Sequence, residues 1–160
     1  MKRILAVVLL LSNWSVSGAD SDVDAQFIGT WVLQEIQART ESGEWVESEA
    51  LGRNPFGIIM YDKIGNMAVQ IVRRDRSIPV EEEAVDEIVN GYVAYTATYD
   101  VDKSASTITH HRKSHINANL GRLSVVRFYE FNGDTLTLTV APERELRLKW
   151  LRLKTKIQIP

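Results

Sequence analysis

The strongest turn signal in the chain lies within residues 123–140, which read LSVVRFYEFNGDTLTLTV. Two runs rich in β-branched, aromatic and aliphatic residues, Leu123–Phe131 and Leu136–Val140, flank the tripeptide Asn132-Gly133-Asp134. An Asn-Gly pair favours the tight turn of a two-stranded hairpin, because both residues tolerate the positive φ angles that such turns require. The segment therefore predicts two neighbouring antiparallel strands.

Strand signals of the same kind recur along the chain at short spacing. Each is a short run of apolar, β-branched or aromatic residues that ends at turn-forming residues. The further predicted strands are Phe27–Ile36, Glu44–Val46, Gly57–Tyr61, Met67–Val72, Tyr92–Val101, Thr107–Ile116 and Leu146–Leu153. A series of about eight to nine short strands, mostly adjacent in sequence, predicts an all-β antiparallel meander that forms a barrel or a sandwich.

One segment departs from this pattern. Residues 81–89, EEEAVDEIV, place their apolar side chains on one face at helical spacing, and Asn90-Gly91 follows as a helix stop. We expect one short helix near residues 80–90, either capping one end of a barrel or lying on its outside. Residues 20–26 are polar and acidic, and we expect a flexible N-terminal arm there, before a barrel domain of residues 27–160.

Residues 1–19 have the pattern of a secretory signal peptide. Lys2 and Arg3 precede the apolar run Ile4–Leu11, and Ser17-Gly18-Ala19 supplies small residues for cleavage before Asp20. The alternative is a membrane anchor that is never removed, but the run is short for a membrane-spanning helix. The pattern predicts a secreted or periplasmic protein without stable membrane insertion after cleavage.

Composition and missing motifs exclude several functions. The formal net charge of −2 argues against nucleic-acid binding, and the absence of cysteine excludes disulfides and thiolate chemistry. Gly-x-Ser-x-Gly, His-Glu-x-x-His and phosphate-binding glycine motifs are absent. His111 and His115 are expected to share one strand face about 13 Å apart, which is too far for a common zinc ion. We therefore predict no cofactor and no metal site; nothing in the sequence indicates an oligomeric state.

Several motifs resemble those of the lipocalin-like domain family, which is distantly related to the lipocalins. Gly29-Thr30-Trp31 is similar to the Gly-x-Trp motif that opens the first lipocalin strand, and the most specific stretch is Gly91-Tyr92-Val93-Ala94-Tyr95. Further similar stretches are residues 57–61, 65–67, 98–99, 107–111, 127–128 and 133–138. The resemblance covers residues 28–152 and implies a closed antiparallel barrel around a small-molecule cavity.

The resemblance also implies how one end of the barrel is closed. In lipocalins, the tryptophan of the Gly-x-Trp motif packs beneath an arginine from a late strand. Arg152 resembles that partner of Trp31, with Arg127 as the other candidate, and a planar cation over an indole face is favourable in any family. Trp150 is expected to be a structural core residue. The chain departs from the lipocalins in having an internal helix and no disulfides.

Side-chain alternation along two strands indicates which residues face the interior. The expected inward sets are Val93, Tyr95, Ala97, Tyr99 and Val101 in one strand and Leu123, Val125, Arg127, Tyr129 and Phe131 in another. The predicted ligand-binding residues are Tyr61, Tyr95, Tyr99, His110, Arg127 and Tyr129. Arg127 would either form a structural ion pair or bind the carboxylate of a ligand. His110 would be either a satisfied interior histidine or a weak candidate for acid–base catalysis.

Three functions are compatible with these residues. We favour an exported protein that binds a small apolar or amphipathic molecule, because small barrels can hold one ligand in a mostly apolar site. A structural or interaction module predicts a solidly filled barrel. A cofactor-independent isomerase or cyclase predicts that His110, Arg127 and a tyrosine converge on one pocket. The cluster Arg73-Arg74-Asp75-Arg76 would be either a solvated loop or a gate for anionic ligands.

Overall fold

The strands predicted from the sequence are present. The structure is a computed structural model that describes residues 24–74, 91–141, 143 and 145–157. The strands in these ranges are β1 (Gly29–Arg39), β2 (Trp45–Glu47), β3 (Phe56–Tyr61), β4 (Asn66–Val72), β5 (Tyr92–Asp102), β6 (Thr107–His115), β7 (Ser124–Asn132), β8 (Thr135–Val140) and β9 (Leu146–Arg152). A short 3₁₀ turn, η1 (Ala118–Leu120), lies between β6 and β7. The predicted leader, most of the predicted arm and the helix expected near residues 80–90 lie outside the described residues.

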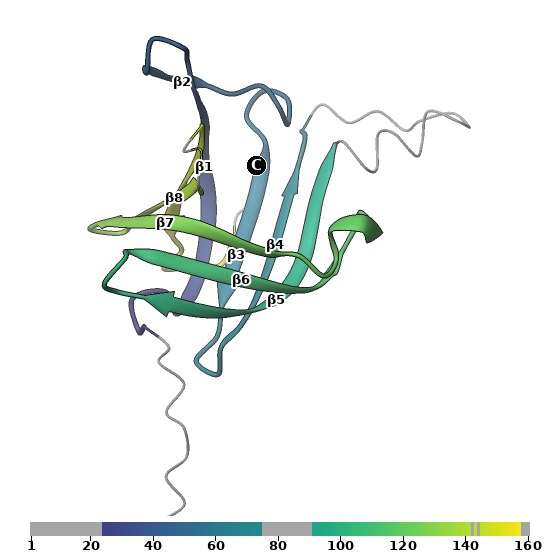
Figure 1. Cartoon of the computed structure of the whole chain (residues 1–160), viewed down its shortest axis with the longest axis vertical. Coiled ribbons are helices and arrows are strands. Elements are labelled where there is room, and N and C mark those ends of the chain that lie inside the picture. Colours follow the sequence, from purple (N-terminus) through teal and green to yellow (C-terminus); the bar gives the residue numbers. More distant parts are fainter. Residues whose placement is uncertain (1–23, 75–90, 142, 144, 158–160) are drawn as a thin grey trace, which may run out of the picture.

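Eight of the described strands close into an antiparallel barrel. The order is β1-β3-β4-β5-β6-β7-β8-β9, and β9 pairs back with β1 from Trp31↔Arg152 to Ala38↔Leu146. The short strand β2 pairs with the last part of β1 and stands outside this ring, as Figure 1 shows. The predicted all-β antiparallel meander is thus confirmed, and it forms a barrel rather than a sandwich.

The β7–β8 hairpin illustrates how the local sequence sets the register. Asn132 pairs with Thr135, which leaves Gly133 and Asp134 as the two loop residues. Gly133 has a φ angle of 57°, a conformation that costs glycine little because it lacks a Cβ. The predicted hairpin is correct, but the asparagine ends the strand and the glycine is the first loop residue.

Side-chain alternation places the core as predicted in most strands. Tyr95, Ala97 and Tyr99 of β5 are buried, and Val93 and Val101 pack against the same cluster. The prediction for β7 is wrong at one position, since Leu123 precedes the strand and is 50% exposed. Alternation constrains side chains only where the backbone is paired, and Leu123 lies outside the paired residues.

A β-bulge in β6 changes which face its last residues occupy. Thr96 pairs with Ser114 and the next residue, Ala97, pairs with Arg112, so that Lys113 is the extra residue of the bulge. A bulge shifts the alternation of side chains by one position. As a result His115 lines the interior, whereas His111 faces outward. The expectation that His111 and His115 share a face is therefore wrong.

Candidate functional site

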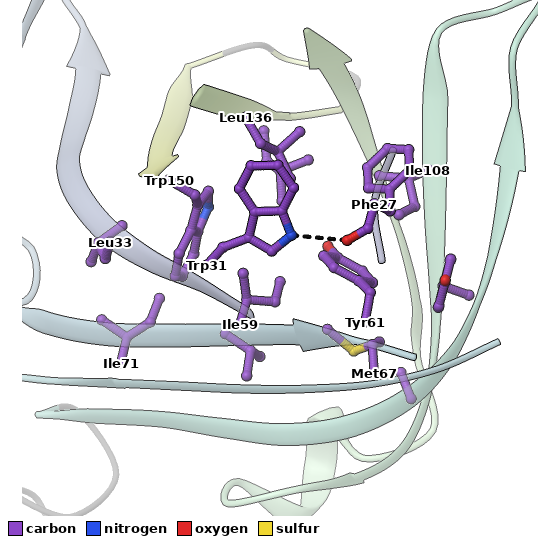
Figure 2. Packing of buried hydrophobic residues seen from close by; sticks show 14 of the residues in the cluster. Phe27, Trp31, Leu33, Ile59, Tyr61, Met67, Ile71, Ile108, Leu136 and Trp150 are labelled. Carbon is purple, nitrogen blue, oxygen red and sulfur yellow. Dashed lines mark hydrogen bonds between the residues drawn. The ribbon is translucent and has the colours of Figure 1, made fainter. Parts of the chain in front are cut away.

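One end of the barrel is closed around Trp31. This residue is fully buried, and its indole Nε1 donates a hydrogen bond to the carbonyl of Phe27 at 2.9 Å, as Figure 2 shows. The guanidinium of Arg152 lies over the indole, 4.1 Å from the ring centroid, and its Nη1 donates to the carbonyl of Ile28 at 2.8 Å. Of the two arginines considered for this position, Arg152 is therefore the one that covers Trp31.

An aromatic plug fills the interior next to this closed end. Phe27 is fully buried because the turn before β1 inserts its ring into the barrel, although the sequence had suggested that it begins the first strand. Its ring centroid lies 4.9 Å from that of Phe131, 5.0 Å from that of Tyr129 and 5.5 Å from that of Tyr61. The rings of Tyr61 and Tyr99 are 4.9 Å apart. We call these five residues the aromatic plug.

Three predicted ligand-binding residues, Tyr61, Tyr99 and Tyr129, belong to this plug. None of them lines the cavity described below. Tyr99 donates its hydroxyl hydrogen to the carbonyl of Asp62 at 2.8 Å, which is a bond within the protein. Strand alternation predicts that a side chain points inward, but it does not predict the depth at which another ring, here that of Phe27, fills the interior.

The other end of the barrel contains a cavity of about 420 Å³. Most of its wall is apolar: Ile36, Ala50, Leu51, Ile59, Val69, Ile71, Val93, Leu120, Leu138, Val140, Leu146 and Leu148. The polar or aromatic residues of the wall are Tyr92, Tyr95, His110, Arg112, His115, Asn117, Arg127 and Trp150. Of the predicted ligand-binding residues, the structure thus brings Tyr95, His110 and Arg127 together at this cavity.

His110 lies between the aromatic plug and the cavity. Its Nε2 is 3.0 Å from the hydroxyl oxygen of Tyr61, and its Nδ1 is 2.9 Å from that of Tyr95. Burial, followed by the charges of Arg127 and Arg112, lowers the pKa of His110 from 6.5 to about 3. A neutral imidazole has one donor and one acceptor nitrogen, so both hydrogen bonds are satisfied when one tyrosine donates and the other accepts.

Two arginines from neighbouring strands, Arg112 of β6 and Arg127 of β7, line the cavity. The Cζ of Arg112 lies 4.8 Å from the ring centroid of Tyr95, and its Nη1 donates to the carbonyl of Leu120 at 3.4 Å. Nη1 of Arg127 donates to the carbonyl of Val126 at 3.2 Å. Among the described residues, no carboxylate forms an ion pair with either arginine. A structural ion pair, one of the two alternatives for Arg127, is therefore absent from the described part of the chain.

The predicted ligand-binding residues did not include five polar or aromatic residues of the cavity wall, namely Tyr92, Arg112, His115, Asn117 and Trp150. Arg112 could have been included, because it lies two residues after His110 on the same strand and therefore on the same face. His115 could not, because its inward position depends on the bulge at Lys113. Trp150 was expected in the core, and it is 1% exposed, yet its ring also borders the cavity.

His115 and Trp150 add two polar groups with defined states. The ring of His115 stacks on Tyr95 with an interplanar angle of 13°, and its Nδ1 accepts a hydrogen bond from the amide of Asn117 at 2.9 Å. Burial and the charge of Arg112 lower the pKa of His115. The neutral ring that accepts at Nδ1 carries its hydrogen on Nε2. Nε1 of Trp150 is buried and has no hydrogen-bond partner among the described residues.

The remaining predicted features lie away from the cavity. His111 contacts Ser124 and Asp100 through its two ring nitrogens, at 2.9 and 2.7 Å. Arg74 donates to the carbonyl of Asn54 at 2.9 Å, while Asp75 and Arg76 lie outside the described residues. In residues 24–74 and 91–157, as far as they are described, no group of histidines and carboxylates is arranged to hold a metal ion, and no helix has the length and hydropathy to cross a bilayer.

Comparison with known families identifies one match. A family model described as a lipocalin-like domain matches residues 28–152. This range begins one residue before β1 and ends with the last residue of β9, so it contains the complete barrel and every cavity residue named above. A search of curated proteins finds no matching sequence.

Proposed function

This chain belongs to the lipocalin-like domain family, and on that premise we propose that it binds a small amphipathic molecule inside its barrel. The observation that carries the proposal is the cavity of about 420 Å³ opposite the aromatic plug. Its volume lies within the range of roughly 300–1,000 Å³ that is typical of small-molecule sites. Its wall combines a mostly apolar surface with a few polar groups, the composition that such sites commonly have.

The division of the interior supports binding rather than a filled structural barrel. The aromatic plug and Trp31 pack one end solidly and contribute hydrophobic stabilisation there. Filling the other end with side chains would add further stabilisation, yet the residues present leave it open. An apolar cavity of this size is costly unless something occupies it.

The state of His110 favours binding over proton-transfer catalysis. Both of its ring nitrogens are engaged by tyrosine hydroxyls, and its low pKa keeps the ring neutral at physiological pH. A general base needs a pKa near the working pH and a free nitrogen within reach of the substrate. We assign His110 a structural function, in which it connects the plug to the cavity wall.

We further propose that the protein is exported, on the basis of the charged, apolar and small-residue segments of residues 1–19. Export would expose the cavity to molecules outside the cytoplasm. Because the chain has no cysteine, its folding in an oxidising compartment does not depend on disulfide formation.

A fluorescence titration tests the binding proposal. The uncharged probe N-phenyl-1-naphthylamine is added to the full chain, and we expect a saturable, blue-shifted emission with one site per molecule. Val93→Trp places a large ring in the cavity wall. We expect it to lower the affinity for the probe by about tenfold or more, because overpacking is unfavourable. Thr96→Trp, on the exposed outer face of the same strand, is the matched control and should bind as the unchanged chain does. Absence of saturable binding, or equal binding by both variants, would refute the proposal.

A further inference from the structure

The charged groups of the cavity wall are all of one sign. Arg112 and Arg127 both line the cavity, and none of the described residues around it is Asp or Glu. Their guanidinium groups remain charged in proteins, and the neighbouring histidines, His110 and His115, have lowered pKa values that keep them neutral at pH 7. The cavity therefore has a positive wall without a counter-charge among the described residues.

The two arginines are close enough to influence each other. The charge of Arg127 is one of the causes that lower the pKa of Arg112, after burial. Burial removes hydration from the charged Arg112, and the like charge of Arg127 near it is also unfavourable. An oxyanion between them would offset both effects.

Two hydrogen-bond donors in residues that line the cavity also lack acceptors among the described residues. Nε of Arg112 and Nε1 of Trp150 are buried, and neither has a partner among the described residues. A buried donor without an acceptor is rare in folded proteins, and an unobserved ligand or water explains many of the exceptions. Neither nitrogen can accept a hydrogen bond, so only a hydrogen-bond acceptor can satisfy either of them.

Arg152 shows what a purely structural arginine looks like in this protein. Its Nη1 and Nη2 donate to the carbonyls of Ile28 and Gln26 at 2.8 and 2.5 Å, and the cation covers Trp31. Each cavity arginine instead forms one longer hydrogen bond to a carbonyl, at 3.4 Å for Arg112 and 3.2 Å for Arg127, and Arg112 also interacts with the side chain of Tyr95. Much of their donor capacity is left for a ligand.

We propose that Arg112, Arg127 and Trp150 bind the anionic head of an amphipathic organic acid, whose apolar part lies against the leucine and isoleucine side chains of the cavity. This inference rests on the proposed binding function and specifies the class of ligand. The planar guanidinium fork suits a carboxylate, which can accept two parallel hydrogen bonds. His115, which carries its hydrogen on Nε2, adds a neutral donor to the same wall.

A pair of probes that differ in one group tests the inference. The sulfonate 8-anilinonaphthalene-1-sulfonate has the ring system of N-phenyl-1-naphthylamine with an added anionic group. We expect the full chain to bind the sulfonate more tightly than the neutral probe. Arg127→Gln and Arg112→Lys should each weaken binding of the sulfonate about tenfold more than they weaken binding of the neutral probe, the usual size of a lost charge-assisted hydrogen bond.

The controls separate this inference from the binding proposal. Binding of the neutral probe by each variant shows that the barrel is folded and that the cavity is intact. Arg122→Gln removes the same charge from an exposed loop position and should leave both probes unaffected. Decanoate should displace the neutral probe at lower concentration than 1-decanol does.

Three outcomes would overturn the inference in distinguishable ways. If both probes bind the unchanged chain and the arginine variants equally well, the cavity binds apolar molecules and the anion site is refuted. If Arg122→Gln weakens binding of the sulfonate as much as Arg127→Gln does, the preference for the sulfonate over the neutral probe arises from overall charge and not from the cavity wall. If neither probe binds, the proposed function fails and the anion site fails with it.

Discussion

His110 makes the stability of the barrel sensitive to acid. Its pKa is about 3 in the folded protein and has its ordinary value of 6.5 in the unfolded chain. Below pH 6.5 the unfolded state takes up a proton that the folded state does not, so folding becomes less favourable as the pH falls. His110 does not reduce the free energy of unfolding above pH 6.5. As the pH falls from 6.5 to about 3, the free energy of unfolding decreases progressively.

The size of the effect follows from the two pKa values. Each pH unit below 6.5 costs about 1.4 kcal/mol, so that lowering the pH to 5 removes about 2 kcal/mol through His110 alone. This is a large share of the roughly 5–15 kcal/mol by which a domain is stable. The side chain is almost completely buried, with 1% of its surface exposed, so screening by solvent does not reduce this value greatly.

Urea unfolding at pH 7.5 and pH 5 measures the effect. The unchanged chain should lose about 2 kcal/mol more than His110→Gln does between these pH values, because glutamine does not titrate. Glutamine also offers one donor and one acceptor to Tyr61 and Tyr95, which helps to preserve the packing at pH 7.5. His111→Gln alters the outward-facing histidine next to Asp100 and is the matched control, since it should retain the loss seen in the unchanged chain. Equal pH dependence in the unchanged chain and His110→Gln would refute the reasoning.

Three further predictions concern packing, the closed end and processing. Gly57→Ala should lower the free energy of unfolding by about 1–3 kcal/mol, because a Cβ there would lie 2.9 Å from Cβ of Leu33; an unchanged midpoint in urea would contradict this contact. Arg152→Met removes the cation over Trp31 and two hydrogen bonds to carbonyls, and should cost about 2 kcal/mol with a shift in tryptophan emission; unaltered emission and stability would show that the end is closed without it. Export should yield a chain that begins at Asp20, and the intact mass of the exported protein checks this, since a mass that includes residues 1–19 would rule out cleavage.

The sequence predicted the strands well because they are short, adjacent and separated by clear turn residues. Alternation in β5 correctly placed Tyr95 and Tyr99 inside, and alternation in β7 correctly placed Arg127 at the interior wall. These successes depend on continuous pairing, which both strands have at these positions.

The remaining parts of the site depend on structural features that the alternation of side chains along a strand does not predict. The bulge at Lys113 turns His115 inward, and no residue pattern in β6 signals an inserted position. Phe27 enters the barrel from a turn and converts Tyr61, Tyr99 and Tyr129 into plug residues instead of cavity residues. The bulge and the position of Phe27 both arise from packing in three dimensions, so they become visible only in the folded barrel.

The central claim is that the cavity binds an amphipathic acid. Native mass spectrometry of the protein, purified gently from the cells that make it, tests this claim most directly. We predict a reproducible additional mass that disappears on denaturation and belongs to one molecule with an acidic group and an apolar portion, and we predict that Arg127→Gln carries less of it. A bare protein mass that remains unchanged after incubation with decanoate would contradict the account.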